Sequence, residues 1–480
     1  MAPIAVGAHR PAPPAAGVRV RPFPERAVLF TVVAAETALL ALGWRTGYSW
    51  LSAALAAGIA LFLIAFRWPD VAWGLTWAAF PFSVERVLPG GSAIRLPTEA
   101  MIPLVLAGWA SRGFWQARGR LPGSPLHLPL AVLAAVALAS SLLGAHPVVG
   151  LKAWVVSAGY AAFGYLYFCC ASCDAARRDR WVRLAMISGA AWGLYGAARI
   201  ISLGAGLHAA YGAARPFFPE HGTYSAFLAM LLPLALLLAV ERRGPGRWGY
   251  ALVLLSLALG IVFSFTRAAW LSVAVVLPLT VLIWSRRRRS ARPFLVSVIA
   301  LSLAVAVVSG VGARRSLTRH AESITDTASV SNLERLNRWI AALNMAENRP
   351  WMGVGYGAYP VEYPRYRRKL IVTEESTRNM GAHSEPLRLL SETGVIGLGA
   401  ALWLLLAAAR VGLRTVRDGD PGSRLLALGI LAGLGTYAVH GLFNSYLAAD
   451  KVAVPFWTGL GVLAALGRAT DPRRGPACGS

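Results

Sequence analysis

Long apolar runs separated by short polar junctions dominate the chain. Fourteen such runs lie at about 27–44, 48–66, 69–84, 97–113, 128–145, 150–171, 181–203, 221–240, 247–265, 267–284, 293–311, 391–410, 424–445 and 452–468. A helix needs about 20 mainly apolar residues to cross a bilayer, so the pattern predicts an all-α polytopic membrane protein. The runs at 69–84 and 97–113 are short and bounded by proline, and 12 spans is therefore the alternative count.

The spacing of the runs also divides the chain. Residues 1–26 are rich in Pro, Ala and Arg and are expected to form a disordered cytoplasmic tail. A bundle of about 11 spans occupies 27–311, a large polar loop with short helices occupies 312–390, and three spans follow at 391–468. Residues 469–480 form a second cytoplasmic tail.

Composition supports this class. Of the 480 residues, 56% are hydrophobic and only 14% are charged, whereas soluble domains are about 45–50% apolar and about 25% charged. The net charge of +25 is compatible with nucleic acid, an anionic membrane surface or an anionic substrate. The positions of the charges decide between these.

Arginines gather at alternate junctions, as the positive-inside rule requires of cytoplasmic loops. They are Arg67; Arg112, Arg118 and Arg120; Arg177, Arg178, Arg180 and Arg183; Arg242, Arg243 and Arg247; Arg286 to Arg289; Arg414, Arg417 and Arg424. Most of the positive charge therefore orients the chain and indicates no nucleic-acid partner. The same layout predicts that the loop at 312–390 lies outside the cytoplasm.

This loop is basic, with 12 Arg and Lys against 8 Asp and Glu. Residues 332–348 have helical spacing, with Leu333, Leu336, Ile340 and Leu343 as an apolar stripe, Met345 as a further candidate member, and a proline at 350 that ends the helix. Gly-rich residues 353–357 follow; they lack the Lys-Ser/Thr of a phosphate-binding loop and predict a tight turn. The loop's basic residues suit an anionic substrate, or equally a surface near anionic lipid. Those with candidate binding roles are Arg335, Arg338, Arg378 and Arg388.

Two further arginines lie at expected external junctions. Arg215 precedes the run at 221–240, and Arg267 stands between two runs, with apolar sequence on both sides. An ionisable group at membrane depth usually faces a cavity or a partner, although a snorkelling arginine is the alternative. Arginine binds phosphate oxygens bidentately and keeps its charge. Together these two residues could neutralise a diphosphate.

One histidine stands where the loop re-enters the membrane. His383, in Gly381-Ala-His-Ser-Glu385, is a candidate general base because its pKa lies near physiological pH. A hydrogen-bonded structural histidine is the alternative. Weaker candidates are His221 and Tyr224 at the outer start of one run, and His440 and Asn444, expected one helical turn apart in another.

Metal and cofactor signals are weak. No HExxH or DxD pattern occurs in the external segments, and Cys169-Cys170-x-x-Cys173 lacks a second pair. We therefore expect a metal-free, cofactor-free mechanism.

These segments, in order, resemble a known family. Arg335-x₃-Trp339, Pro350-Trp-Met-Gly-Val-Gly355, Ala382-His383 and Glu392-Thr-Gly-Val-Ile-Gly397 are similar to the signature of the O-antigen ligase and polymerase superfamily (Wzy and WaaL type). Segments around Arg215, Arg267 and His440 to Asn444 also resemble it. Two departures are Ser384, where the family usually has Asn, and His221 with Gly222, where Asn is common.

The resemblance implies a fold and an activity. Such proteins are bacterial inner-membrane glycosyltransferases with a GT-C-like helical bundle, here of about 12–14 spans. They transfer a glycan from undecaprenyl diphosphate at the periplasmic face to lipid A–core (ligases) or to another lipid-linked glycan (polymerases). A chain-length regulator is a candidate partner. The resemblance further implies that Arg215 and Arg267 bind the diphosphate, His383 activates the acceptor, and Arg335 and Arg338 position the donor.

Two other readings remain open. A transporter of lipid-linked sugar would place its charges near the bilayer midplane, whereas the candidate residues here gather at one expected face. A structural membrane scaffold would leave Arg215, Arg267 and His383 unexplained.

Overall fold

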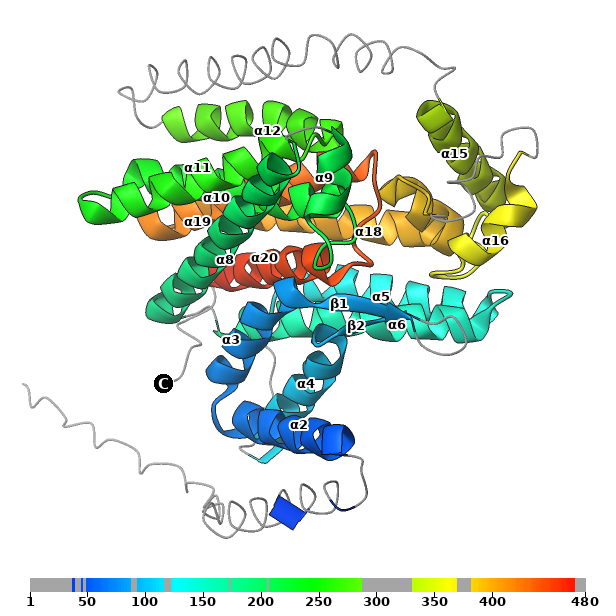
Figure 1. Ribbon diagram of the computed structural model, residues 1–480, viewed down its shortest axis with the longest axis horizontal. Helices are drawn as coiled ribbons and strands as arrows, with labels where there is room; N and C mark the ends of the chain where they lie inside the picture. Colours follow the sequence, from blue (N-terminus) through cyan, green and yellow to red (C-terminus); the bar gives the residue numbers. More distant parts are fainter. Residues whose placement is uncertain are drawn as a thin grey trace, which may run out of the picture.

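The computed structural model describes residues 37–38, 45, 49–87, 93–115, 122–171, 174–204, 207–286, 330–368 and 381–470. Helices dominate these ranges (Figure 1): α2 (Ser49–Arg67), α3 (Pro69–Ala79), α4 (Thr98–Trp115), α5 (His127–Leu143), α6 (Pro147–Ala161), α7 (Tyr167–Ala171), α8 (Ala175–Ser202), α9 (Leu207–Ala213), α10 (His221–Glu241), α11 (Pro245–Phe263), α12 (Arg267–Ser285), α15 (Val330–Asn348), α16 (Tyr359–Tyr366), α18 (Glu385–Asp418), α19 (Pro421–Gly441) and α20 (Asp450–Ala469). A 3-10 turn (η1, Phe80–Phe82) follows α3, and a π-helical turn (η2, Ala162–Leu166) joins α6 to α7.

Eight of the described helical segments are long and apolar enough to cross a membrane, and two shorter apolar helices accompany them. The prediction of an all-α polytopic membrane protein is confirmed. The expected runs at 27–44 and 293–311 lie mostly outside the described residues, so the total of 12 to 14 spans stays a prediction. The run at 69–84 forms only the 11-residue α3, which is too short to cross a bilayer alone.

A small antiparallel hairpin follows η1. Its strands β1 (Val84–Val87) and β2 (Ala93–Leu96) pair Val84 with Leu96 and Val87 with Ala93. Buried hydrogen bonds connect the residue before the hairpin to the start of α20. The Lys451 ammonium donates to the Ser83 carbonyl (3.0 Å) and hydroxyl (2.6 Å). Ser83 in turn donates to Asp450. Burial of this charged pair is tolerated because its polar atoms are hydrogen-bonded.

Helix α10 is the centre of the bundle. Almost all of its side chains are buried, because α8, α11, α12, α19 and α20 all pack against it. The α19 contact is close: Gly433 has no room for a β-carbon beside the Met230 carbonyl, and Thr436 donates to the Ala229 carbonyl at 3.1 Å. Small residues permit such close helix packing in membranes.

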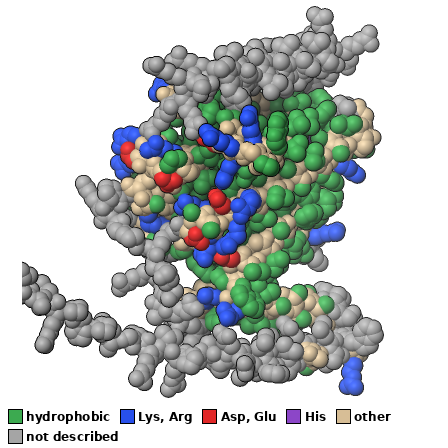
Figure 2. Space-filling model, turned by 90° about the vertical axis from the view of Figure 1, so that its left-hand side faces the viewer, with side chains coloured by type: hydrophobic (Ala, Val, Ile, Leu, Met, Phe, Trp, Pro, Cys, Tyr) green, Lys and Arg blue, Asp and Glu red, His purple; other side chains and the backbone are tan. Residues whose placement is uncertain are grey.

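Arginines gather at one end of the bundle. Within the described residues they lie in the first turns of α8, beside the junctions between α10 and α11 and between α18 and α19, and at the end of α20. Figure 2 looks onto the end of the molecule opposite α15 and α16, where Lys and Arg side chains appear with a few Asp and Glu. One of their contacts joins Arg468 to the Cys169 carbonyl.

The opposite end carries the loop helices. Helices α15 and α16 lie beside the start of α18 (Figure 1) and share a small core of their own, formed by Ala341, Ala342, Met345, Val354, Ala358, Tyr359, Tyr363 and Ala382. The predicted helix at 332–348 is confirmed as α15, but among the described residues of the predicted apolar stripe only Met345 is fully buried. Leu336 and Leu343 are about half exposed, because the smaller side chains of Ala341 and Ala342 allow the tyrosines of α16 to approach closely.

Glycines join the loop to α18. Gly394, with φ of 68°, interrupts the helical dihedral angles of α18, and a β-carbon there would collide with the Trp351 carbonyl. Gly353, with φ of 69°, approaches the Glu392 carbonyl as closely. Both positions need glycine for conformation and space. The predicted tight turn at 353–357 is therefore present, and it holds the loop against α18.

Candidate active site

His383 lies in the short segment between the loop and α18, two residues before the first residue of that helix. Its backbone has φ of 49°, a left-handed conformation that costs a non-glycine residue about 1–2 kcal/mol. The indole of Trp339 donates to the His383 carbonyl at 3.4 Å. Burial, followed by the charges of Arg338 and Arg335, lowers the pKa of His383 to about 3. The free protein therefore holds this imidazole neutral, with a lone pair available.

Four arginines converge on the same end of the bundle. Arg215 follows α9, Arg267 begins α12, and Arg335 and Arg338 lie one turn apart on α15. Arg335 is close enough to interact electrostatically with His383, His221 and Arg267.

Arg338 is held by the loop. Its Nη1 donates to the Gly381 carbonyl at 3.2 Å, and its own carbonyl accepts from the Tyr359 hydroxyl at 2.8 Å. The side chain is buried, yet its Nε finds no hydrogen-bond partner among the described residues. A buried guanidinium with spare donor capacity is suited to an anion.

Glu220, which the sequence analysis did not single out, is the acidic member of the group. It precedes α10, and its carboxyl interacts with Arg338, Arg215 and Arg335 and hydrogen-bonds Tyr446. Burial raises its pKa in spite of the hydrogen bond to Tyr446 and those three charges, all of which lower it. Its position directly before His221 was the available signal, but nothing in the sequence connects it to Tyr446.

His221 and His440 complete the group from α10 and α19. His440 is buried, and neither of its ring nitrogens has a hydrogen-bond partner within the described ranges; the same holds for Nδ1 of His221. Buried, unpaired polar atoms are rare in native proteins and require an explanation such as a ligand or water. His221 interacts electrostatically with Arg335, and His440 with His221, so a polar ligand bound at Arg335 would be close to these unpaired atoms.

Asn444 belongs to the same group of residues, but its position in the structure differs from the one that the sequence predicts. Helix α19 ends at Gly441, so Asn444 is not one helical turn from His440 but lies in the following loop. There its side chain hydrogen-bonds His383 and accepts from the Tyr446 hydroxyl at 3.1 Å. The ring of Tyr446 meets that of His440 edge-on at 5.6 Å. We call the whole set the arginine–histidine cluster: Arg215, Glu220, His221, Arg267, Arg335, Arg338, His383, His440, Asn444 and Tyr446.

Two predicted residues, Tyr224 and Arg388, lie outside this cluster. The Tyr224 hydroxyl is directed into the bundle, where it donates to the Trp192 and Gly193 carbonyls at 3.1 Å. Arg388 is paired with Glu385 and, at 2.6 Å, with Glu392, and it stacks on Tyr356 at 5.5 Å. Its guanidinium thus stabilises the start of α18. Arg378 lies outside the described residues.

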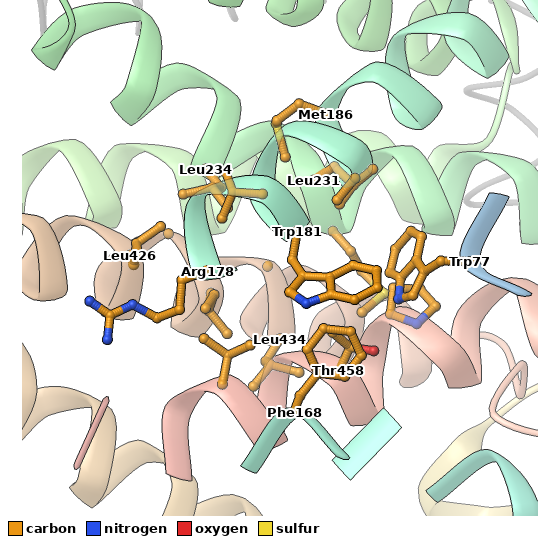
Figure 3. Close-up of a pocket in the computed structure, with 18 residues that line it drawn as sticks. Trp77, Phe168, Arg178, Trp181, Met186, Leu231, Leu234, Leu426, Leu434 and Thr458 are labelled. Carbon is orange, nitrogen blue, oxygen red and sulfur yellow. The ribbon is translucent and has the colours of Figure 1, made fainter. Parts of the chain in front are cut away.

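An apolar cavity between the helices is separate from the cluster. It has a volume of about 90 Å³ and is lined by residues of α3, α7, α8, α10, α19 and α20. Figure 3 shows Trp77 and Trp181 at one side of it and Arg178, near the arginine-rich end of α8, at the other. None of the cluster residues lines this cavity, so it is not the place where the charged groups converge.

The cluster is suited to one kind of chemistry. Arginines provide permanent positive charge for a phosphate-containing ligand, and a neutral imidazole can take a proton from a hydroxyl. Within the part of the chain that the structure describes, no three His, Cys, Asp or Glu side chains are grouped so that they could hold a metal ion.

Fold and cluster define a polytopic helical membrane protein with a basic, histidine-containing site at one end of its bundle. Residues 250–404 match the family model Wzy_C, O-antigen ligase, and this match supports assigning the chain to the O-antigen ligase and polymerase family. The matched region contains Arg267, Arg335, Arg338 and His383. No curated protein sequence matches the chain.

Proposed function

We propose that the protein is an inverting glycosyltransferase with a GT-C-like bundle, located in the bacterial inner membrane with its site at the periplasmic face. It transfers a glycan from undecaprenyl diphosphate to an acceptor hydroxyl, with lipid A–core as the acceptor. The observation that carries the proposal is a group of four arginines, two of which, Arg335 and Arg338, act directly on a neutral histidine. The family match supports ligase- or polymerase-type transfer.

Each residue of the cluster has a separate role in the proposed reaction. Arg215 and Arg267 bind the donor diphosphate, and Arg335 and Arg338 position it and stabilise the charge that develops as it leaves. The acceptor oxygen attacks C1 of the donor sugar, and the C1–O bond to the diphosphate breaks. The acceptor proton passes to His383. Because lipid diphosphate is a good leaving group, charge stabilisation and positioning are the main requirements.

A reconstituted assay tests this function. Purified protein receives undecaprenyl diphosphate-linked glycan together with lipid A–core, and the products are separated by size. A single transfer to lipid A–core supports a ligase, whereas a ladder of glycan on the lipid carrier indicates a repeat-unit polymerase. EDTA is expected to leave the rate unchanged.

Two substitutions connect the activity to the cluster. His383→Ala and Arg267→Ala are expected to lower turnover at least 100-fold, since a general base contributes about 10²–10⁴-fold. Matched controls are His127→Ala, which loses hydrogen bonds to Tyr165 and Pro122 far from the cluster, and Arg247→Ala at the opposite end. Full activity in both cluster variants would refute the assignment.

A further inference from the structure

Tyr446 is held firmly beside the cluster. Its ring is buried, its backbone N–H donates to the Tyr437 hydroxyl at 3.3 Å, and its own hydroxyl donates to Oδ1 of Asn444 at 3.1 Å. Gly222 lies so close to this hydroxyl that a β-carbon there would collide with it. The packing therefore leaves the Tyr446 hydroxyl one position.

The side chain of Asn444 also hydrogen-bonds the imidazole of His383. With the amide oxygen as the acceptor, as in its bond with Tyr446, a ring N–H of His383 points at Asn444. The other ring nitrogen then keeps its lone pair, as a general base requires.

Glu220 completes the chain of hydrogen bonds from the other side. The Glu220 carboxyl hydrogen-bonds the Tyr446 hydroxyl, and this bond lowers the pKa of Glu220, whereas burial, the larger effect, raises it. The Tyr446 hydroxyl therefore lies between the Glu220 carboxyl and the side chain of Asn444.

We propose that Tyr446 and Glu220 are positioning residues, which act through Asn444 to hold the imidazole of His383 in one tautomer and one orientation. The inference rests on the proposed role of His383 as the base. Neither residue is placed at the reacting atoms, and the Tyr446 hydroxyl can be removed without changing the charge beside the arginines, so its removal should lower kcat and leave donor binding intact.

The first test is Tyr446→Phe, which removes only the hydroxyl. Residues that orient a functional histidine typically change activity 10–100-fold, and we expect kcat to fall about 10-fold or more with the donor KM changed less than 2-fold. The matched control is Tyr224→Phe, which removes another buried, hydrogen-bonded hydroxyl outside the cluster and should retain kcat. Thermal unfolding of both variants in detergent checks that they fold.

The second test separates hydrogen bonding from charge at Glu220. The amide of Glu220→Gln can still hydrogen-bond the Tyr446 hydroxyl, so this variant should keep kcat within about 3-fold. Glu220→Ala cannot form this bond, and its kcat should fall as far as that of Tyr446→Phe. Equal losses in the Gln and Ala variants would overturn the inference, as would a change in donor KM alone.

The outcomes distinguish this inference from the proposed function. If the wild-type protein transfers glycan and His383→Ala does not, while Tyr446→Phe keeps full kcat, only the positioning role is wrong. If the wild-type protein transfers no glycan to either acceptor, the proposed function itself fails.

Discussion

The imidazole of His383 lies near positively charged arginines, and these charges determine how the rate of transfer should depend on pH. Arg338 and Arg335 help to lower its pKa to about 3 in the free protein. A bound diphosphate would offset those two charges and so raise the pKa of His383 toward its ordinary value. A base loses activity when the pH falls below its pKa.

We therefore expect kcat, which reports the donor complex, to decline at higher pH than kcat/KM, which reports the free enzyme. The measurement is the rate of glycan transfer between about pH 4.5 and 8 at saturating and at low donor concentrations. Arg247→Ala, remote from the cluster, should show the same separation. Coincident acid limbs would contradict a diphosphate next to His383.

At the scale of the element, α15 presents an unusual face to the protein. Its buried side contains Glu334, Asn337 and Arg338 as well as Ala342 and Met345, whereas Leu336 and Leu343 are half exposed. Helical periodicity in the sequence distinguishes an apolar face of the helix from a polar one. It does not show which of the two faces packs against the rest of the protein. A helix at a membrane surface can keep apolar residues outward and place its polar side over a charged site.

Two truncations on α15 test this orientation. Met345→Ala creates a cavity in the loop core and should lower the free energy of unfolding by about 2–5 kcal/mol, with reduced transfer because Arg338 shifts. Leu343→Ala removes a half-exposed side chain and should cost less than about 1 kcal/mol. Thermal or denaturant unfolding measures both. A larger loss for Leu343→Ala would mean that the helix is rotated from the orientation described.

At the scale of the whole molecule, segments distant in sequence bring like charges together. Arg267 and Arg335 repel one another across the cluster, and within the described ranges Glu220 is the carboxylate that interacts with three of the four arginines. Repulsion between these arginines destabilises the fold. An anion that binds to them should stabilise it.

Inorganic pyrophosphate is a simple probe of this effect. We expect it to raise the Tm in detergent, by a free energy that grows as RT ln(1 + [L]/Kd), and the shift should shrink as salt screens the charges. Arg267→Gln should reduce the shift and Arg247→Ala should preserve it. An equal shift in wild type and Arg267→Gln would place the anion elsewhere.

The sequence predicted part of this arrangement and could not predict the rest. Apolar runs and alternating arginines suffice for the class of fold and for bringing Arg215, Arg267 and His383 to one end, since both follow from the cost of burying charge in lipid. The link from Glu220 through Tyr446 to Asn444 depends on side-chain packing between α10 and the loop after α19. Ser384 illustrates the same limit: it replaces the asparagine usual beside the histidine, and the amide at His383 comes instead from Asn444.

The left-handed backbone at His383 makes this position suited to chemical rescue. Glycine adopts φ near 49° without the cost that His383 bears, so His383→Gly should fold at least as well as His383→Ala and leave a gap the size of the lost ring. Free imidazole added at millimolar concentration should restore part of the transfer rate in the glycine variant. Arg267→Ala, whose base is intact, should gain nothing from it.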